Sequence, residues 1–158
     1  MLQAAIEYSN FADLFTSRIF WCVLGGWFVA SVIKMFVASV RTRKLDFNYL
    51  LTTGGMPSCH SSTVTALAFS VGYTTGFDSG ATAVAIGLAL VTMFDAATVR
   101  KAAGEHAKVL NEIVHDLKEL KLKPAKRLKE LLGHTRLEVL LGMVTGIAWS
   151  TFVCWYWD

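Results

Sequence analysis

Four long apolar stretches limit what this chain can fold into. The first runs from Ile19 to Val40 with Lys34 as its one charged residue, and three uncharged stretches cover 61–77, 79–94 and 139–157. Each is close to the roughly 20 residues that cross a bilayer. Hydrophobic residues make up 54% of the 158 residues and charged ones only 17%, which is too apolar for an ordinary soluble domain. We therefore predict an all-α integral membrane protein, a single membrane-embedded domain over residues 1–158 built as a bundle of about four transmembrane helices.

The segments around these stretches predict a hairpin and an amphipathic helix. Gly76 and Gly80 bound a turn between the two middle stretches, whose many small residues permit close helix contact in lipid. From Val99 to Leu120 apolar residues recur every three or four positions, while charged residues take the other face. This pattern predicts an amphipathic helix lying on the membrane or against the bundle. Lys34, near the end of the first stretch, is placed to extend its ammonium group toward the lipid headgroups.

Two helix signals follow the amphipathic segment. Pro124 predicts a short helix over 124–132, with Gly133 as its C-cap. Thr135 and Glu138 have the spacing of a capping box, so the last transmembrane helix is expected to begin there. His134 then lies in the joint between the two helices.

Basic residues are concentrated at one set of helix ends. Basic residues follow the first stretch after Val40, follow the third stretch from Arg100 and cluster over 118–136 before the last stretch. The 76–80 turn and the tail after Trp157 have none. Since cytoplasmic ends carry the excess of Lys and Arg, these ends and the amphipathic helix are expected to face the cytoplasm, and both termini the other side. The candidate ionisable residues then share the cytoplasmic face, and they are Lys34, Arg41, His60, Asp95, Arg100, His106, His134 and Glu138.

The stretch from Gly54 to Ser62 reads Gly-Gly-Met-Pro-Ser-Cys-His-Ser-Ser. A glycine pair lets the backbone curl, Pro57 suits a first helical turn, and small hydroxyl residues open an uncharged helix. A helix N-terminus binds anions through its free N–H groups and its dipole, so we expect His60 at the centre of a phosphate site. The same residues also fit ordinary turn and cap chemistry with a structural histidine.

The ionisable residues favour phosphoryl transfer without a metal. One histidine is expected to attack phosphorus and another to protonate the leaving oxygen, while Arg and Lys neutralise the phosphate oxygens. The sequence has no carboxylate cluster for Mg²⁺, and Cys22, Cys59 and Cys154 lack the spacing of a zinc site or a disulfide framework. We therefore expect no metal and no cofactor. The net charge of +3 supports no nucleic-acid partner.

Several of these residues also have a simpler interpretation. The basic group 41–44 is explained by the positive-inside bias, and Glu138 by helix capping. His106 and His115 are explained by a solvated helix face. These alternatives stay open on the residues alone.

Four segments carry a resemblance to a known family. They are Gly-Gly-Met-Pro-Ser-Cys-His-Ser at 54–61, Phe-Asp-Ala-Ala-Thr-Val-Arg at 94–100, Ala-Gly-Glu-His-Ala-Lys-Val-Leu-Asn at 103–111 and Leu-Lys-Glu-Leu-Leu-Gly-His-Thr at 128–135. From Lys34 to Gly146 the chain resembles the divergent branch of the type 2 phosphatidic acid phosphatases, relatives of the vanadium haloperoxidases. The resemblance implies a membrane-embedded enzyme that removes phosphate from a lipid.

The parent superfamily has three motifs, and the chain departs from the first two at one position each. Lys34 and Arg41 have the spacing of Lys-x6-Arg-Pro, with Thr42 in place of the proline. The 57–60 segment, Pro-Ser-Cys-His, matches Pro-Ser-Gly-His with Cys59 in place of the glycine.

The third motif, Ser-Arg-x5-His-x3-Asp, has two partial matches. Arg100 and His106 have the arginine spacing, but Leu110 stands where the acid belongs. His134 and Glu138 have the acid, without an arginine five residues before the histidine. We prefer His134 with Arg100, because the resemblance to the divergent branch includes His134 and because Glu138 is placed to orient its imidazole.

The resemblance then implies a role for each residue. His60 is expected to be the general acid, His134 the nucleophile and Glu138 its catalytic partner. The expected phosphate-binding residues are Lys34, Arg41, Ser58 and Arg100, and the expected supporting residues are Asp95, His106 and Asn111.

We expect a metal-independent phosphatase that hydrolyses a phosphomonoester or diphosphate of a membrane lipid through a phosphohistidine, in a bacterial cytoplasmic membrane with its site facing the cytoplasm. Phosphatidylglycerophosphate, phosphatidic acid and isoprenoid phosphates all fit this expectation. A non-catalytic membrane protein that binds anionic headgroups is the first alternative, and vanadate-dependent oxidation is a weaker one. Four spans are few for a self-sufficient site, which leaves room for a homodimer.

Overall fold

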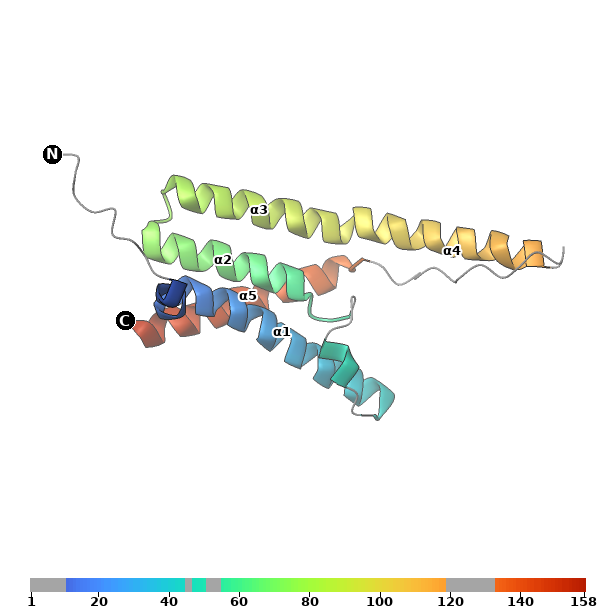
Figure 1. Ribbon diagram of the computed structural model, residues 1–158, viewed down its shortest axis with the longest axis horizontal. Helices are drawn as coiled ribbons and strands as arrows, with labels where there is room; N and C mark the ends of the chain where they lie inside the picture. The colour runs from blue at the N-terminus through green and yellow to red at the C-terminus, as the bar shows by residue number, and fades with distance from the viewer. Residues whose placement is uncertain (1–10, 45–46, 51–54, 119–132) are drawn as a thin grey trace.

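The computed structural model describes residues 11–44, 47–50, 55–118 and 133–158, and over these residues the protein consists of helices and short connections, with no strand (Figure 1). The helices are α1 (Arg18–Thr42), α2 (Cys59–Thr75), α3 (Gly80–Ala97), α4 (Val99–Lys118) and α5 (Arg136–Trp157), with short 3₁₀ helices at Phe11–Thr16 and Phe47–Leu50. The predicted all-α class is confirmed. The short helix predicted over 124–132 lies outside the described residues.

Three helical segments are long and apolar enough to cross a membrane, namely Arg18–Thr42, Gly80–Val114 and Arg136–Trp157. The chain is therefore an integral membrane protein. The fourth expected span, α2, has 17 residues, or about 26 Å at 1.5 Å per residue. That is slightly less than the hydrocarbon thickness of about 30 Å, so the count of four stays a prediction.

Helix α2 lies at the centre of the bundle and contacts α1, α3 and α5 (Figure 1). Small residues permit this close packing. A Cβ atom at Gly142 or Gly146 of α5 would overlap the carbonyl oxygen of Ser58 or Ser62, and one at Gly26 of α1 would lie 2.9 Å from Cβ of Ala66. Glycines at this four-residue spacing bring the backbones of membrane helices into contact.

Buried hydroxyl groups join the same helices. The Ser62 hydroxyl donates to the carbonyl of Gly26 at 2.8 Å, and the Ser150 hydroxyl donates to the carbonyl of Ala66 at 3.2 Å. Hydrogen bonds across helices are among the forces that hold a bundle together in lipid, where apolar burial alone gives little advantage.

Helix α4 continues the direction of α3 beyond the other helices (Figure 1). Thr98 is the single residue between the two helices, and its φ and ψ of −120° and −69° mark the break. The predicted amphipathic helix is confirmed, although its described part contacts α3 and no other helix. This helix was expected either to pack against the bundle or to lie on the membrane surface. Packing against the bundle is not observed for its described part, and a position on the membrane surface stays a prediction.

The start of α1 and the end of α5 meet at the end of the bundle far from the start of α2 (Figure 1). Nη1 of Arg18 lies 2.8 Å from Oδ1 of Asp158, and the guanidinium stands over the Tyr73 ring at 5.6 Å from its centroid. The hydrogen bond from the Tyr73 hydroxyl, together with Arg18, holds the pKa of the Asp158 carboxyl below its usual value. Arg18, which is not among the basic residues used to orient the chain, has its charge matched at this end by Asp158.

Substitution of Gly146 should test the contact between α2 and α5. Gly146→Ala should lower the melting temperature, because the new Cβ would overlap the Ser62 carbonyl and the Thr65 hydroxyl. Overpacking of this kind costs about 1–3 kcal/mol. Gly87→Ala is the matched control, because a Cβ there meets no atom within 4 Å and alanine favours a helix by about 1 kcal/mol. Thermal unfolding in detergent measures both variants, and equal melting temperatures would contradict the packing.

Candidate functional site

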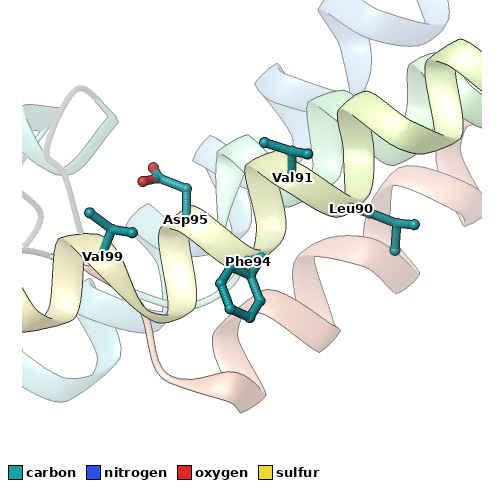
Figure 2. Close-up of a pocket in the computed structure, with 5 residues that line it drawn as sticks. All are labelled: Leu90, Val91, Phe94, Asp95 and Val99. Atoms are coloured by element: carbon teal, nitrogen blue, oxygen red, sulfur yellow. The ribbon is translucent and has the colours of Figure 1, made fainter.

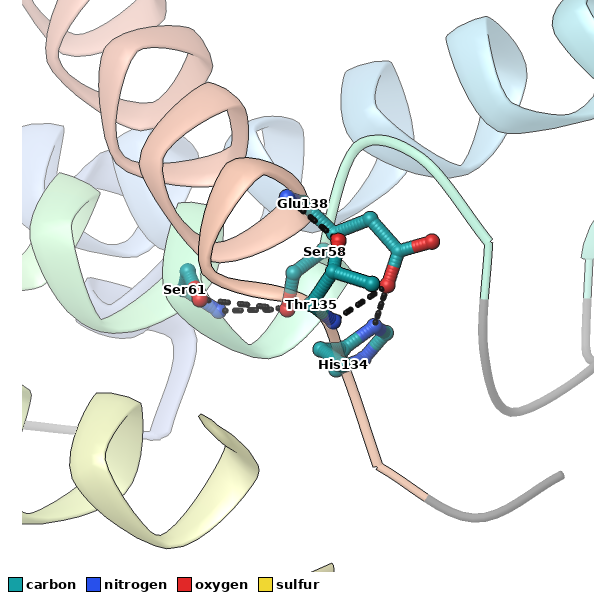
Figure 3. A network of polar contacts seen from close by, with 5 residues as sticks. All are labelled: Ser58, Ser61, His134, Thr135 and Glu138. Atoms are coloured by element: carbon teal, nitrogen blue, oxygen red, sulfur yellow. Dashed lines mark hydrogen bonds and ion pairs between the residues drawn. The ribbon is translucent and has the colours of Figure 1, made fainter. Parts of the chain in front are cut away.

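Ser58 is the N-cap of α2. Its φ and ψ of −70° and 117° are extended, and its hydroxyl oxygen accepts from the backbone N–H of Ser61 at 3.3 Å and from the Ser61 hydroxyl at 3.1 Å (Figure 3). The loop before it turns at Gly55, whose φ is +92°. The predicted loop feeding a helix N-terminus is confirmed, but placing Pro57 in the first helical turn was wrong. Because Ser58 supplies the capping oxygen, the helix begins after it at Cys59, and Pro57 precedes the cap.

His134 is held by hydrogen bonds at both its backbone and its ring. Its backbone N–H donates to the carbonyl of Ala96, at the end of α3, at 2.9 Å. Its Nδ1 atom lies 3.3 Å from Oε2 of Glu138, and the residue is only 7% exposed (Figure 3). These contacts fix both the position and the orientation of the imidazole.

Glu138 also forms the capping box that the sequence predicted. Its Oε2 atom accepts from the backbone N–H of Thr135 at 2.8 Å, and the Thr135 hydroxyl accepts from the backbone N–H of Glu138 at 3.3 Å. One carboxylate oxygen therefore serves both the first turn of α5 and the His134 ring. The capping interpretation and the histidine-orienting interpretation of Glu138 describe the same contacts.

The imidazole rings of His60 and His134 lie side by side. Their centroids are 6.1 Å apart, and their planes are inclined by 58°. The backbone N–H of Ser58 donates to the carbonyl of Glu138 at 3.0 Å, which ties the start of α2 to the first turn of α5. Two histidines that are distant in the sequence are thereby brought to one place.

The contact with Glu138 sets the chemistry of the His134 ring. If Nδ1–H donates to the carboxylate, Nε2 keeps its lone pair and is available as a nucleophile. A carboxylate also stabilises the positive charge that develops on an imidazole as it attacks. The arrangement can therefore support attack by Nε2 of His134 with His60 as a nearby proton donor.

Lys34 lies under the loop that leads into α2. It is 5% exposed, and its Cγ and Cδ atoms are each 3.3 Å from the position that a Cβ atom would take at Gly55. The expectation that its ammonium extends toward the headgroups was wrong, because the 55–58 loop and α2 cover this part of α1. Ser31, one turn earlier, contacts Cys59 with 3.3 Å between Oγ and Sγ.

The remaining candidates lie on α1, α3 and α4. Arg41 is exposed in the last turn of α1, and Asp95 is half-buried next to Ala96. Arg100 is in the first turn of α4, and its side chain lies outside the described part of the structure. His106 is exposed and Asn111 half-buried further along α4, which contacts only α3 within the described chain. The structure thus brings together His60, His134, Glu138 and Ser58, with Lys34 beneath the adjoining loop.

An open surface hollow of about 520 Å³ lies along the end of α3 (Figure 2) and is not lined by the histidine pair. Its lining is apolar except for one carboxylate, and the residues are Leu90, Val91, Phe94, Asp95 and Val99. All of them belong to α3 or to the first position of α4. Over the residues that the structure describes, no group of three or more His, Cys, Asp or Glu side chains is arranged to hold a metal ion.

Sequence reasoning missed two contacts that position the site. The Ala96 carbonyl has no side-chain signal, because any residue offers the same backbone acceptor. The contact between Ser31 and Cys59 has a weak signal, because Ser31 lies one helical turn before Lys34 and therefore on a neighbouring part of the same face.

Comparison with known proteins agrees with the resemblance found in the sequence. The model of a family described as "Divergent PAP2 family" matches residues 15–149. This chain belongs to the Divergent PAP2 family. The matched range contains every candidate site residue named above. A membrane protein called YuiD and described as uncharacterized, from Bacillus subtilis (strain 168), is a similar relative, 41% identical over 138 residues, which cover 80% of this chain and 87% of the relative. No solved structure matches.

The capping role of Glu138 can be tested by measuring the thermal stability of variants. Thr135→Ala should destabilise the protein by about 1 kcal/mol, because an alanine N-cap leaves the first turn of α5 without its acceptor. Glu138→Ala should also destabilise it, whereas Glu138→Gln should be close to the wild type, since an amide oxygen can still accept from Thr135. Thermal unfolding in detergent gives the ranking. A Glu138→Ala variant as stable as the wild type would contradict the capping box.

Proposed function

We propose that this member of the Divergent PAP2 family hydrolyses a phosphomonoester or diphosphate of a membrane lipid through a phosphohistidine. The observation that carries the proposal is the pair of His60 and His134 rings, 6.1 Å apart beside the N-terminus of α2, with Nδ1 of His134 on Glu138. Membership of the family supports a phosphatase-related function as the general class of activity. The lipid substrate and the catalytic roles are proposed from the geometry of the site.

In the first step Nε2 of His134 attacks phosphorus. A P–N bond forms, the bond from phosphorus to the lipid oxygen breaks, and His60 gives its proton to that oxygen. In the second step His60 accepts a proton from water as the water oxygen attacks phosphorus. The P–N bond breaks, and inorganic phosphate and free His134 are released.

Positive charge at the site would stabilise the transition state. The N-terminus of α2 presents backbone N–H groups and the positive end of the helix dipole, to which Lys34, Arg41 and Arg100 would add fixed charge. Ser58 is fully buried and its hydroxyl caps α2, so we propose that it contributes by ordering this N-terminus. Asp95 and Asn111 remain proposed supporting residues.

The substrate is proposed to be a lipid phosphate, because the site lies at one end of a bundle of apolar helices. A phosphate at the membrane surface reaches that depth when it is attached to an acyl or isoprenoid chain. The excess of basic residues at this end supports a site that faces the cytoplasm.

Headgroup binding without catalysis is a second candidate. It is favoured by the departures from the first and third superfamily motifs, at Thr42 in the first and in the two partial matches to the third. The geometry of His134 favours catalysis instead, because binding an anion needs no carboxylate beside the imidazole.

Phosphate release is the direct test. Purified protein in detergent should release phosphate from at least one of phosphatidylglycerophosphate, phosphatidic acid and an isoprenoid phosphate, in excess EDTA and with inhibition by vanadate. Vesicles with the cytoplasmic face outward should hydrolyse an added short-chain substrate, whereas vesicles of the opposite orientation should not. Headgroup binding without phosphate release would support the non-catalytic candidate. Loss of activity in EDTA that magnesium restores would contradict the metal-free mechanism.

Histidine variants should separate the two catalytic roles. His134→Ala should abolish turnover and leave no acid-labile phosphoenzyme. His60→Ala should lose about 10²–10⁴-fold with lipid substrates and recover part of its rate with an activated aryl phosphate, whose leaving group needs no proton. His106→Gln is the control and should be nearly unchanged, because His106 is exposed on α4.

Trapping the intermediate identifies the nucleophile. Rapid quench under alkaline conditions and peptide mapping should find the phosphoryl group on His134. Thr135→Ala should keep its activity while Glu138→Ala loses it, which separates orientation of His134 from capping. Phosphate on the His106 peptide, or an inactive His106→Gln beside an active His134→Ala, would overturn the assignment.

A further inference from the structure

Helices α1 and α5 run antiparallel in a register that three contacts define. The ion pair joins Arg18 to Asp158 at 2.8 Å, and the indole N–H of Trp149 donates to the carbonyl of Trp21 at 3.2 Å. The Trp149 ring also occupies the space that a side chain at Gly25 would need. Moving four residues inward from the ion pair on both helices leads to Cys22 on α1 and Cys154 on α5.

The two thiols pack against each other in the interior. Cys22 is 0% exposed and Cys154 is 1% exposed, and they form one buried cluster with Val153, against which Trp149 packs. Both cysteines are free thiols. A single buried cysteine is an ordinary small apolar residue. Two cysteines in one cluster, at facing positions of neighbouring helices, are candidates for a cross-link.

We propose that Cys22 and Cys154 form a paired thiol site that closes into a disulfide between α1 and α5 by exchange with a low-molecular-weight disulfide. One cysteine thiolate attacks the reagent disulfide, which gives a mixed disulfide and releases one small thiol. The second cysteine then attacks the mixed disulfide, the Cys22–Cys154 bond forms, and a second small thiol leaves. The two cysteine protons end on the two released thiols, so the cysteines are oxidised and the reagent is reduced.

The location suits this chemistry. Each cysteine lies four residues, or about 6 Å along the helix axis, from the helix end that carries the Arg18–Asp158 pair. Under the orientation proposed above, this end lies on the non-cytoplasmic side of the membrane. Disulfides form and persist on that side. The link would fix α1, which carries Lys34, against α5, whose first turn orients His134. Cys59 is not part of the pair, since its contact is with Ser31 near the other end of the bundle.

The reaction is tested on purified Cys59→Ser protein in detergent, which retains two of the three cysteines. The reagent is 4,4′-dithiodipyridine, a small apolar disulfide. After denaturation, maleimide-polyethylene glycol counts the free thiols on a non-reducing gel. We expect the number of free thiols to fall from two to zero, with two thiopyridone molecules released per chain and no covalent dimer. Peptide mapping should find Cys22 joined to Cys154, and the oxidised protein should melt at a higher temperature.

Single-thiol proteins provide the matched controls. Cys22→Ser or Cys154→Ser, each combined with Cys59→Ser, should give at most one mixed disulfide, no internal cross-link and no rise in melting temperature. Two stable mixed disulfides per chain, a cross-link between chains, or two thiols that remain free would overturn the proposal. The measurement needs no phosphatase assay, so its failure is distinguishable from failure of the proposed function.

Discussion

The close approach of α5 to α2 is the constraint on which the site depends. Gly142 and Gly146 leave no side chain between the two backbones, so α5 rests against the carbonyl oxygens of Ser58 and Ser62. At that separation the backbone N–H of Ser58 reaches the carbonyl of Glu138, which sets the starts of the two helices at the same height. In lipid, where burial of apolar surface favours no particular partner, such contacts decide which helix faces meet.

This packing turns two local helix signals into one functional unit. Glu138 lies three residues after Thr135 and four after His134, so a single carboxylate oxygen reaches the N-cap backbone and the imidazole together. The cap of α5 and the orientation of His134 therefore share one carboxylate. His60 completes the arrangement from α2, because its helix starts at Cys59 directly after the Ser58 cap.

The fold was predictable where the signals are local in the sequence. Uncharged runs gave the approximate limits of the long helices, Gly76 and Gly80 marked the hairpin, and Thr135 with Glu138 marked the start of α5. Predictions failed where a side chain depends on a neighbouring helix. Lys34 was expected to extend toward headgroups, but the loop at Gly55 covers it, and Pro57 was expected inside α2, but the Ser58 hydroxyl caps the helix after it.

By itself, the sequence determined that this is a helical membrane protein of the Divergent PAP2 family, because hydrophobic runs, capping residues and motif spacing are properties of the linear chain. The sequence favoured His134 over His106, but only the tertiary structure placed its ring beside that of His60. It also decided that Arg18 meets Asp158 and that Cys22 meets Cys154. These pairs depend on the register of α1 against the parallel helices α2 and α5. That register is set by how small residues on different helices fit together, which no segment of the sequence contains alone.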